Sequence, residues 1–252
     1  MKNFNHFAPI IILSLSCAIP QLGKQLVNLE TFDLNFDVDR FYSPEIETAK
    51  LYSAQRDEIL AGKKEEEFGD KLIDPWSFET IAVDSVFVDD IFAPSKQLVG
   101  LQYNMKSHTL GDSLALYGNM HFEGLNMMRS KEGNFMALVA TKENENEEAF
   151  RTLLARLEKK YGKAKITEKD FFGGYNVYSW QLQDRLIAIS SKHNDKSNEL
   201  KVAIDTDRKT IDTAKHATID TKFFLLSNKY RQAISGNLKS GAWLYFDKLG
   251  SR

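Results

Sequence analysis

The chain has 252 residues, of which 42% are hydrophobic, and its 17 Phe, 9 Tyr and 3 Trp can fill a sizeable core. Lys and Arg (33) nearly balance Asp and Glu (35), giving a formal net charge of -2. This balance excludes an electrostatic basis for binding nucleic acid or an anionic membrane surface. The single cysteine excludes an internal disulfide, so core packing must hold the fold.

The first eighteen residues, 1–18, have the layout of a secretory signal peptide. Lys2 provides a basic start, and residues 8–19 form an apolar run broken only by Pro9, Ser14 and Ser16. The run is shorter than the roughly 20 apolar residues that a membrane-spanning helix needs. We therefore predict an exported cell-envelope protein, either in the periplasm or anchored by lipid to the outer membrane of a Gram-negative bacterium.

Cys17 lies at the end of this segment, and two processing routes compete for it. Ser16 and Ala18 are the small residues that a general signal peptidase requires, with cleavage after Ala18. Residues 13–17 (Leu-Ser-Leu-Ser-Cys) resemble instead a bacterial lipoprotein signal, although Ser14 stands where that signal has leucine. Both routes stay open, and a lipid on Cys17 is the only membrane contact that we expect.

Residues 31–39 alternate apolar with acidic or amide side chains, which predicts a half-buried strand. Asp33, Asn35 and Asp37 match the first ligands of an EF-hand loop, but Val38 occupies the position that needs glycine. We therefore predict no calcium site there.

A helix follows this strand. Ser43 and Pro44 favour a helix N-terminus, and Gly62 favours an end near Ala61. From residue 78 onward strands dominate. Runs of β-branched and aromatic residues predict strands at 81–88, 98–105, 118–128 and 134–141.

The clearest helical pattern precedes Gly162, with Asn144 as its predicted cap. Its apolar stripe consists of Phe150, Leu153, Leu154, Leu157 and Tyr161. A meander is predicted next, with strands at 165–172, 175–182, 185–191 and 200–205, followed by an amphipathic piece at 225–234 and an aromatic strand at 242–246.

This order of elements predicts an α+β fold, with a largely antiparallel meander sheet covered by one or two amphipathic helices. Residues 19–77 would form an N-terminal strand and helix segment, and 78–252 the α+β domain. The alternative is a single domain spanning 19–252.

The sequence contains no nucleophile elbow, P-loop or dinucleotide-binding glycine pattern. The histidines also lack the spacing of zinc ligands, so we predict no metal, no cofactor and no catalytic residues. An acid–base pair assembled only in three dimensions would draw on His121, His108, or the neighbouring Asp89 and Asp90.

Aromatic residues gather around a predicted hairpin turn. Phe171, Phe172 and Tyr175 flank its tip, and we name them as the candidate binding surface because aromatic side chains dominate binding hot spots. The alternative is that they belong to the core. The tripeptide Ile-Asp-Thr recurs at 204, 211 and 219, which we interpret as chance recurrence in a surface excursion.

We expect a non-enzymatic protein that binds an envelope protein or a surface ligand through its sheet. The alternatives are a periplasmic or secreted hydrolase and an inhibitor or immunity-like protein. A deep pocket around His121 would favour the hydrolase, and a flat, aromatic-rich surface would favour the binding protein.

Overall fold

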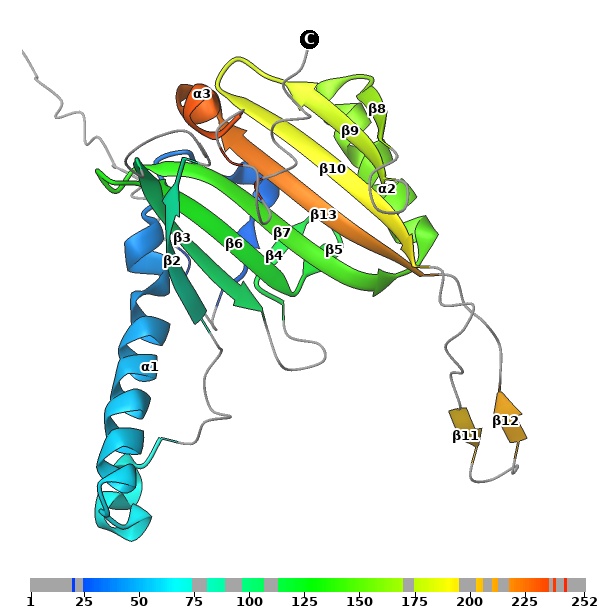
Figure 1. Ribbon diagram of the computed structural model, residues 1–252. Helices are drawn as coiled ribbons and strands as arrows, with labels where there is room; N and C mark the ends of the chain where they lie inside the picture. The colour runs from blue at the N-terminus through cyan, green and yellow to red at the C-terminus, as the bar shows by residue number, and fades with distance from the viewer. Residues whose placement is uncertain are drawn as a thin grey trace, which may run out of the picture.

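The computed structural model describes residues 20, 25–73, 81–88, 97–106, 113–169, 175–194, 203–205, 210–212, 218–235, 238 and 243. Its main element is an eight-stranded antiparallel sheet in the order β2-β3-β6-β7-β13-β10-β9-β8 (Figure 1). These strands are β2 (Ile81–Phe87), β3 (Leu98–Lys106), β6 (Gly124–Ser130), β7 (Phe135–Glu145), β8 (Lys165–Lys169), β9 (Tyr175–Gln181), β10 (Arg185–Asn194) and β13 (Thr218–Ser227). The predicted α+β class with a largely antiparallel sheet is confirmed.

The sheet has two halves, and in each half one helix precedes four strands in the chain. Helix α1 (Val38–Leu60) precedes β2, β3, β6 and β7, and helix α2 (Glu147–Tyr161) precedes β8, β9, β10 and β13. The last strands of the two halves, β7 and β13, pair antiparallel at the centre of the sheet. The first strands, β2 and β8, are therefore the two edges.

Shorter elements complete the described fold. They are β1 (Val27–Asn28), the 3-10 turn η1 (Leu29–Thr31), the kinked 3-10 segment η2 (Glu65–Lys71), β4 (Ala115–Tyr117), β5 (Met120–Phe122), β11 (Ala203–Asp205), β12 (Thr210–Asp212), the 3-10 turn η3 (Asn228–Tyr230) and α3 (Arg231–Ile234). β4 pairs with β5 antiparallel and with β1 in parallel. β11 and β12 pair only with each other among the described strands.

The central strands are buried on both faces. On one face, side chains of α1 and α2 form a single cluster with Phe223 and Leu225 of β13. On the other, Phe224 and Leu226 pack with Ile234 of α3 and with the C-terminal residues Leu238 and Trp243. A strand buried on both faces does not alternate apolar with polar residues. The prediction of an amphipathic segment at 225–234 was therefore wrong for residues 225–227, which belong to β13.

The predicted strand at 31–39 was also wrong, because this segment is a turn followed by the start of α1. Asp33 Oδ1 accepts the Asn35 N–H at 2.9 Å, and Asp37 Oδ1 accepts the Arg40 N–H at 2.9 Å. Short carboxylate side chains satisfy local backbone donors, which favours turns and helix caps over strands. Asp37 thus caps α1.

α1 begins earlier than predicted and contains Pro44. Proline has no N–H to donate to the carbonyl of Arg40, and Ser43 Oγ donates to that carbonyl instead, at 3.1 Å. The helix ends at Leu60 before Gly62, whose φ of 104° suits glycine. In Figure 1, the second half of α1 stands clear of the sheet.

Three further predictions differ from the structure. The strand expected at 118–128 is divided, because Gly118 (φ 59°) begins the turn between β4 and β5 and a bend at Glu123 separates β5 from β6. Asn146 caps α2 in place of Asn144 by accepting the Ala149 N–H at 2.8 Å. The fourth strand of the second half is β13, and the predicted strand at 200–205 contributes only β11. The predicted strand at 242–246 lies outside the described residues except for Trp243.

Candidate functional site

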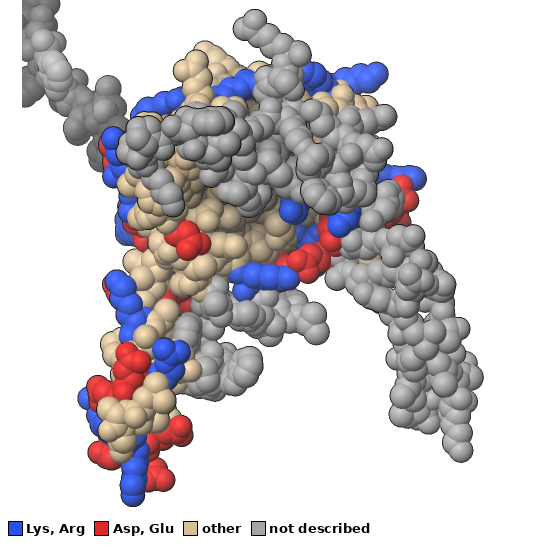
Figure 2. All heavy atoms as spheres, in the orientation of Figure 1, with Lys and Arg blue, Asp and Glu red and all other residues tan. Residues whose placement is uncertain are grey.

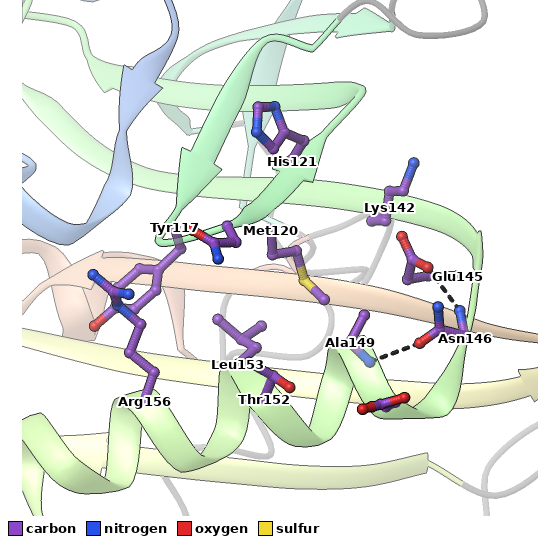
Figure 3. A pocket seen from close by; sticks show the side chains of 12 residues that line it. Tyr117, Met120, His121, Lys142, Glu145, Asn146, Ala149, Thr152, Leu153 and Arg156 are labelled. Atoms are coloured by element: carbon purple, nitrogen blue, oxygen red, sulfur yellow. Dashed lines mark hydrogen bonds between the residues drawn. The ribbon is translucent and has the colours of Figure 1, made fainter.

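A cleft of about 440 Å³ lies between the β4–β5 hairpin, the end of β7 and the first half of α2 (Figure 3). Its floor is apolar and includes Met120, Ala149 and Leu153. Its rim is polar and carries His121, Asn119, Lys142, Glu145, Asn146, Glu148, Thr152 and Arg156. An apolar floor with a polar rim is the usual composition of a small-molecule pocket.

The cations at this rim are already paired within the protein. Lys142 Nζ lies 3.0 Å from Glu123 Oε2, and Arg156 Nη2 lies 2.8 Å from Glu30 Oε2. These ion pairs join the segments around the cleft. The carboxylates of Glu123 and Glu30 neutralise both cations, so neither cation needs a ligand to balance its charge.

Tyr117 forms the inner wall of the cleft and is 1% exposed. Its hydroxyl oxygen is buried and makes no hydrogen bond to any described residue. Burial, with a smaller contribution from Tyr161, raises the pKa of Tyr117. Tyr117 is therefore a neutral phenol at physiological pH and packs as part of the wall.

His121 is the one expected acid–base residue that the structure places at the cleft. Its Nδ1 lies 3.2 Å from Ser113 Oγ, and its side chain is exposed. Within the described part of the chain, no carboxylate hydrogen-bonds to the His121 ring. His108, Asp89 and Asp90 lie outside the described residues.

Cys17, Phe171 and Phe172 lie outside the described residues, and only the backbone of Tyr175 is described, at the start of β9. Across the described ranges, no group of three His, Cys, Asp or Glu side chains could hold a metal ion. The helices of these ranges also include none that is long and apolar enough to span a membrane.

A second feature concerns the exposed apolar side chains of the described residues, most of which lie on the β2 side of the sheet. Among the described residues, seven large apolar side chains are exposed, and six of them belong to α1, the segment after it, or the β2–β3 edge. These six are Leu51, Leu60, Leu72, Val83, Phe87 and Leu98. We refer to these six residues together as the apolar end. The seventh, Ile166, lies on β8 at the opposite edge.

Helix α1 is held in place near both of its ends. At its base, Asp39 accepts hydrogen bonds from Tyr103 and from Arg129 Nε, the latter at 3.0 Å. Farther along, Gln55 donates to the Lys71 carbonyl at 2.6 Å and accepts the Ile73 N–H at 2.9 Å. These hydrogen bonds attach the segment that follows α1 to the helix. The projection is therefore stabilised by its own tertiary contacts.

Charged residues of both signs cover the lower end of this projection in Figure 2, and two exposed leucines lie on the same helix. Leu60 is 77% exposed and Leu51 is 60% exposed.

Comparison with the known protein families gives no match, and comparisons with curated proteins and with solved structures give none either.

Proposed function

We propose that this is an exported cell-envelope protein that acts by binding another protein, and that the apolar end is its binding surface. The supporting observation is that six of the seven exposed large apolar side chains of the described residues belong to α1, the segment after it or the β2–β3 edge, against a single one at the opposite edge. Surface apolar residues that are scattered singly need no explanation, whereas a gathering of them is typical of an interaction site.

The energetics agree with this proposal. A fully buried leucine contributes about 1.5–3 kcal/mol relative to an exposed one, so a partner that covers Leu51 and Leu60 gains substantial free energy. The α1 projection also extends beyond the sheet, which makes it accessible to a partner (Figure 1). An inhibitor or immunity-like protein would be one form of this function.

Photo-cross-linking in the cells that make the protein tests this function. A photoreactive amino acid would replace Leu51 in one variant and Ile166 in the other, since both side chains are exposed and apolar. We expect one discrete protein adduct from position 51 and none from position 166. Equal labelling from both positions, or none from position 51, would contradict the proposal.

A hydrolase is the second candidate, and the contact between Ser113 and His121 beside the cleft is what favours it. Histidine beside a serine hydroxyl can act as a general base. Hydrolysis of simple ester substrates that is abolished in Ser113→Ala and in His121→Ala would support this candidate. Hydrolysis that persists in both variants would exclude this pair as its source.

A further inference from the structure

We propose that the β2 edge binds an extended segment of the partner protein as an added strand, with a basic residue of that segment opposite Asp84. This proposal rests on the proposed binding function and specifies how the partner is recognised. Strand addition supplies affinity through main-chain hydrogen bonds and specificity through alternate side chains.

The β2 edge is suited to pairing because, within the described residues, β2 pairs only with β3. An edge strand presents a row of backbone N–H and C=O groups to an incoming strand. β2 is seven residues long, which allows several such hydrogen bonds.

The two edge strands differ in the number of charged residues, which usually protect an edge strand from pairing with another chain. β8 has three charged residues in five, Lys165, Glu168 and Lys169, whereas β2 has only Asp84 in seven. Charged side chains, lysine above all, discourage pairing at an edge. The two edges occupy equivalent places in the two halves of the sheet, so the contrast marks β2 as the edge open to pairing.

The two faces of β2 carry different chemistry. Val83 pairs with Tyr103 on the helix-bearing face and is 43% exposed. Asp84 points to the other face, where it is exposed and its Oδ2 lies 3.5 Å from Gln102 Nε2. The complementary strand therefore has apolar residues on one face and a lysine or arginine on the other.

The same carboxylate disfavours a second copy of this chain as the occupant. Asp84 is the central residue of β2. Antiparallel pairing of two β2 strands over their whole length would place the two Asp84 carboxylates opposite each other, and directly opposed like charges destabilise a strand pair. A partner with a basic residue at this position removes the repulsion and gains an attraction.

Two synthetic peptides test the proposal with the mature chain. Each has nine residues that alternate threonine and valine, with a central lysine in one and a central glutamate in the other. Fluorescence anisotropy would give their affinities, and amide hydrogen exchange would report protection of residues 81–87. We expect the lysine peptide to bind about three- to tenfold more tightly than the glutamate peptide, because attraction to Asp84 replaces repulsion in the cross-strand pair.

Charge reversal provides the matched variant. Asp84→Lys should reverse the preference, whereas Asp57→Lys, which makes the same charge change on the exposed part of α1, should preserve it. Equal affinities for the two peptides, binding without protection of 81–87, or self-association through β2 would overturn strand addition. If neither peptide binds while position 51 still cross-links a partner, strand addition is wrong and the binding function stands.

Discussion

Arg156 in α2 and Glu30 in the N-terminal segment form a two-point ion pair across 126 residues of sequence. Arg156 Nη2 donates to Oε2 at 2.8 Å and Nε donates to Oε1 at 3.4 Å, while Lys160 Nζ donates to the Glu30 carbonyl at 2.8 Å. The N-terminal segment is thereby fixed to α2, and it carries β1, which pairs with β4 beside the cleft.

Glu30→Gln should reduce stability in a pH-dependent way. Arg156 lowers the pKa of Glu30 below its ordinary value of 4.5. Because the folded-state pKa is depressed, the pair stabilises the fold above that ordinary value, and this stabilisation is lost as the pH falls through the folded-state pKa. Urea midpoints of the two proteins should differ near neutral pH and converge in acid.

The matched control for this prediction is Arg151→Gln, which removes an exposed ion pair with Glu147 on the same helix. Exposed pairs of this kind contribute little to stability, so the control should change the urea midpoint less than Glu30→Gln does. A Glu30→Gln effect that is as small as that of the control, or independent of pH, would count against stabilisation of the fold by the Glu30–Arg156 ion pair.

Gly118→Ala should destabilise the protein more than Gly133→Ala. Both glycines have positive φ, 59° and 87°, and this conformation costs a residue with a Cβ about 1–2 kcal/mol. Only at Gly118 would the Cβ also meet another side chain, 2.9 Å from Arg156 Cδ. Urea unfolding measures both losses. In an Arg156→Ala background the difference between the two substitutions should shrink, and an unchanged difference would refute this explanation.

Tyr42→Phe should lower stability by about 0.5–1.5 kcal/mol, because it removes a buried hydrogen bond. The Tyr42 hydroxyl donates to the Leu125 carbonyl at 3.1 Å, and its ring stacks on Tyr103 with centroids 5.3 Å apart. Tyr52→Phe on the projecting part of α1 is the control for loss of a less buried hydroxyl.

The same variant should change the response to alkali. Burial raises the pKa of Tyr42 above its ordinary value of 10.0. The neutral phenol therefore stabilises the fold fully below that ordinary pKa, and this stabilisation is lost as the pH rises from there toward the folded-state pKa. Urea unfolding above pH 10 should show a shallower decline in stability for Tyr42→Phe. Parallel declines in both proteins would contradict this assignment.

The intact mass of the mature protein should show loss of the signal segment. A chain that begins at Cys17 with a lipid-sized increment would establish the anchored form, and an unmodified chain that begins at Ile19 would establish the released form. Masses would be measured on membrane and soluble fractions. An uncleaved chain would overturn the prediction of export.

A helix or strand could be predicted from the sequence where one of its faces is polar and the other is apolar. α2 shows this, since Phe150, Leu153 and Leu157 are buried at helical spacing as predicted. β13 could not be recognised, because Phe223 and Phe224 are both buried on opposite faces and leave no period of two. At 31–39 the alternation was real, but a turn and a helix start bury its apolar residues equally well.

The candidate site was less predictable than the fold. Leucines at 51 and 60 read as core residues in a helical pattern, and only the three-dimensional course of α1 leaves them exposed. Val83 likewise lies in a strand that the sequence predicts, but its place at the sheet edge follows from the strand order β2-β3-β6-β7, which local patterns do not encode. Exposure depends on what packs above a residue, and this is a property of the tertiary structure.

The central claim is that the apolar end binds a partner protein, and the affinity of the purified, cross-linked partner tests it most directly. Isothermal titration would compare the unaltered protein, a Leu51→Asp and Leu60→Asp double variant, and Ile166→Asp as the control at the opposite edge. We predict that the double variant weakens binding at least about tenfold, equivalent to roughly 1.4 kcal/mol, and that the control leaves it unchanged. Equal affinities for all three proteins would contradict the assignment of the apolar end as the binding surface.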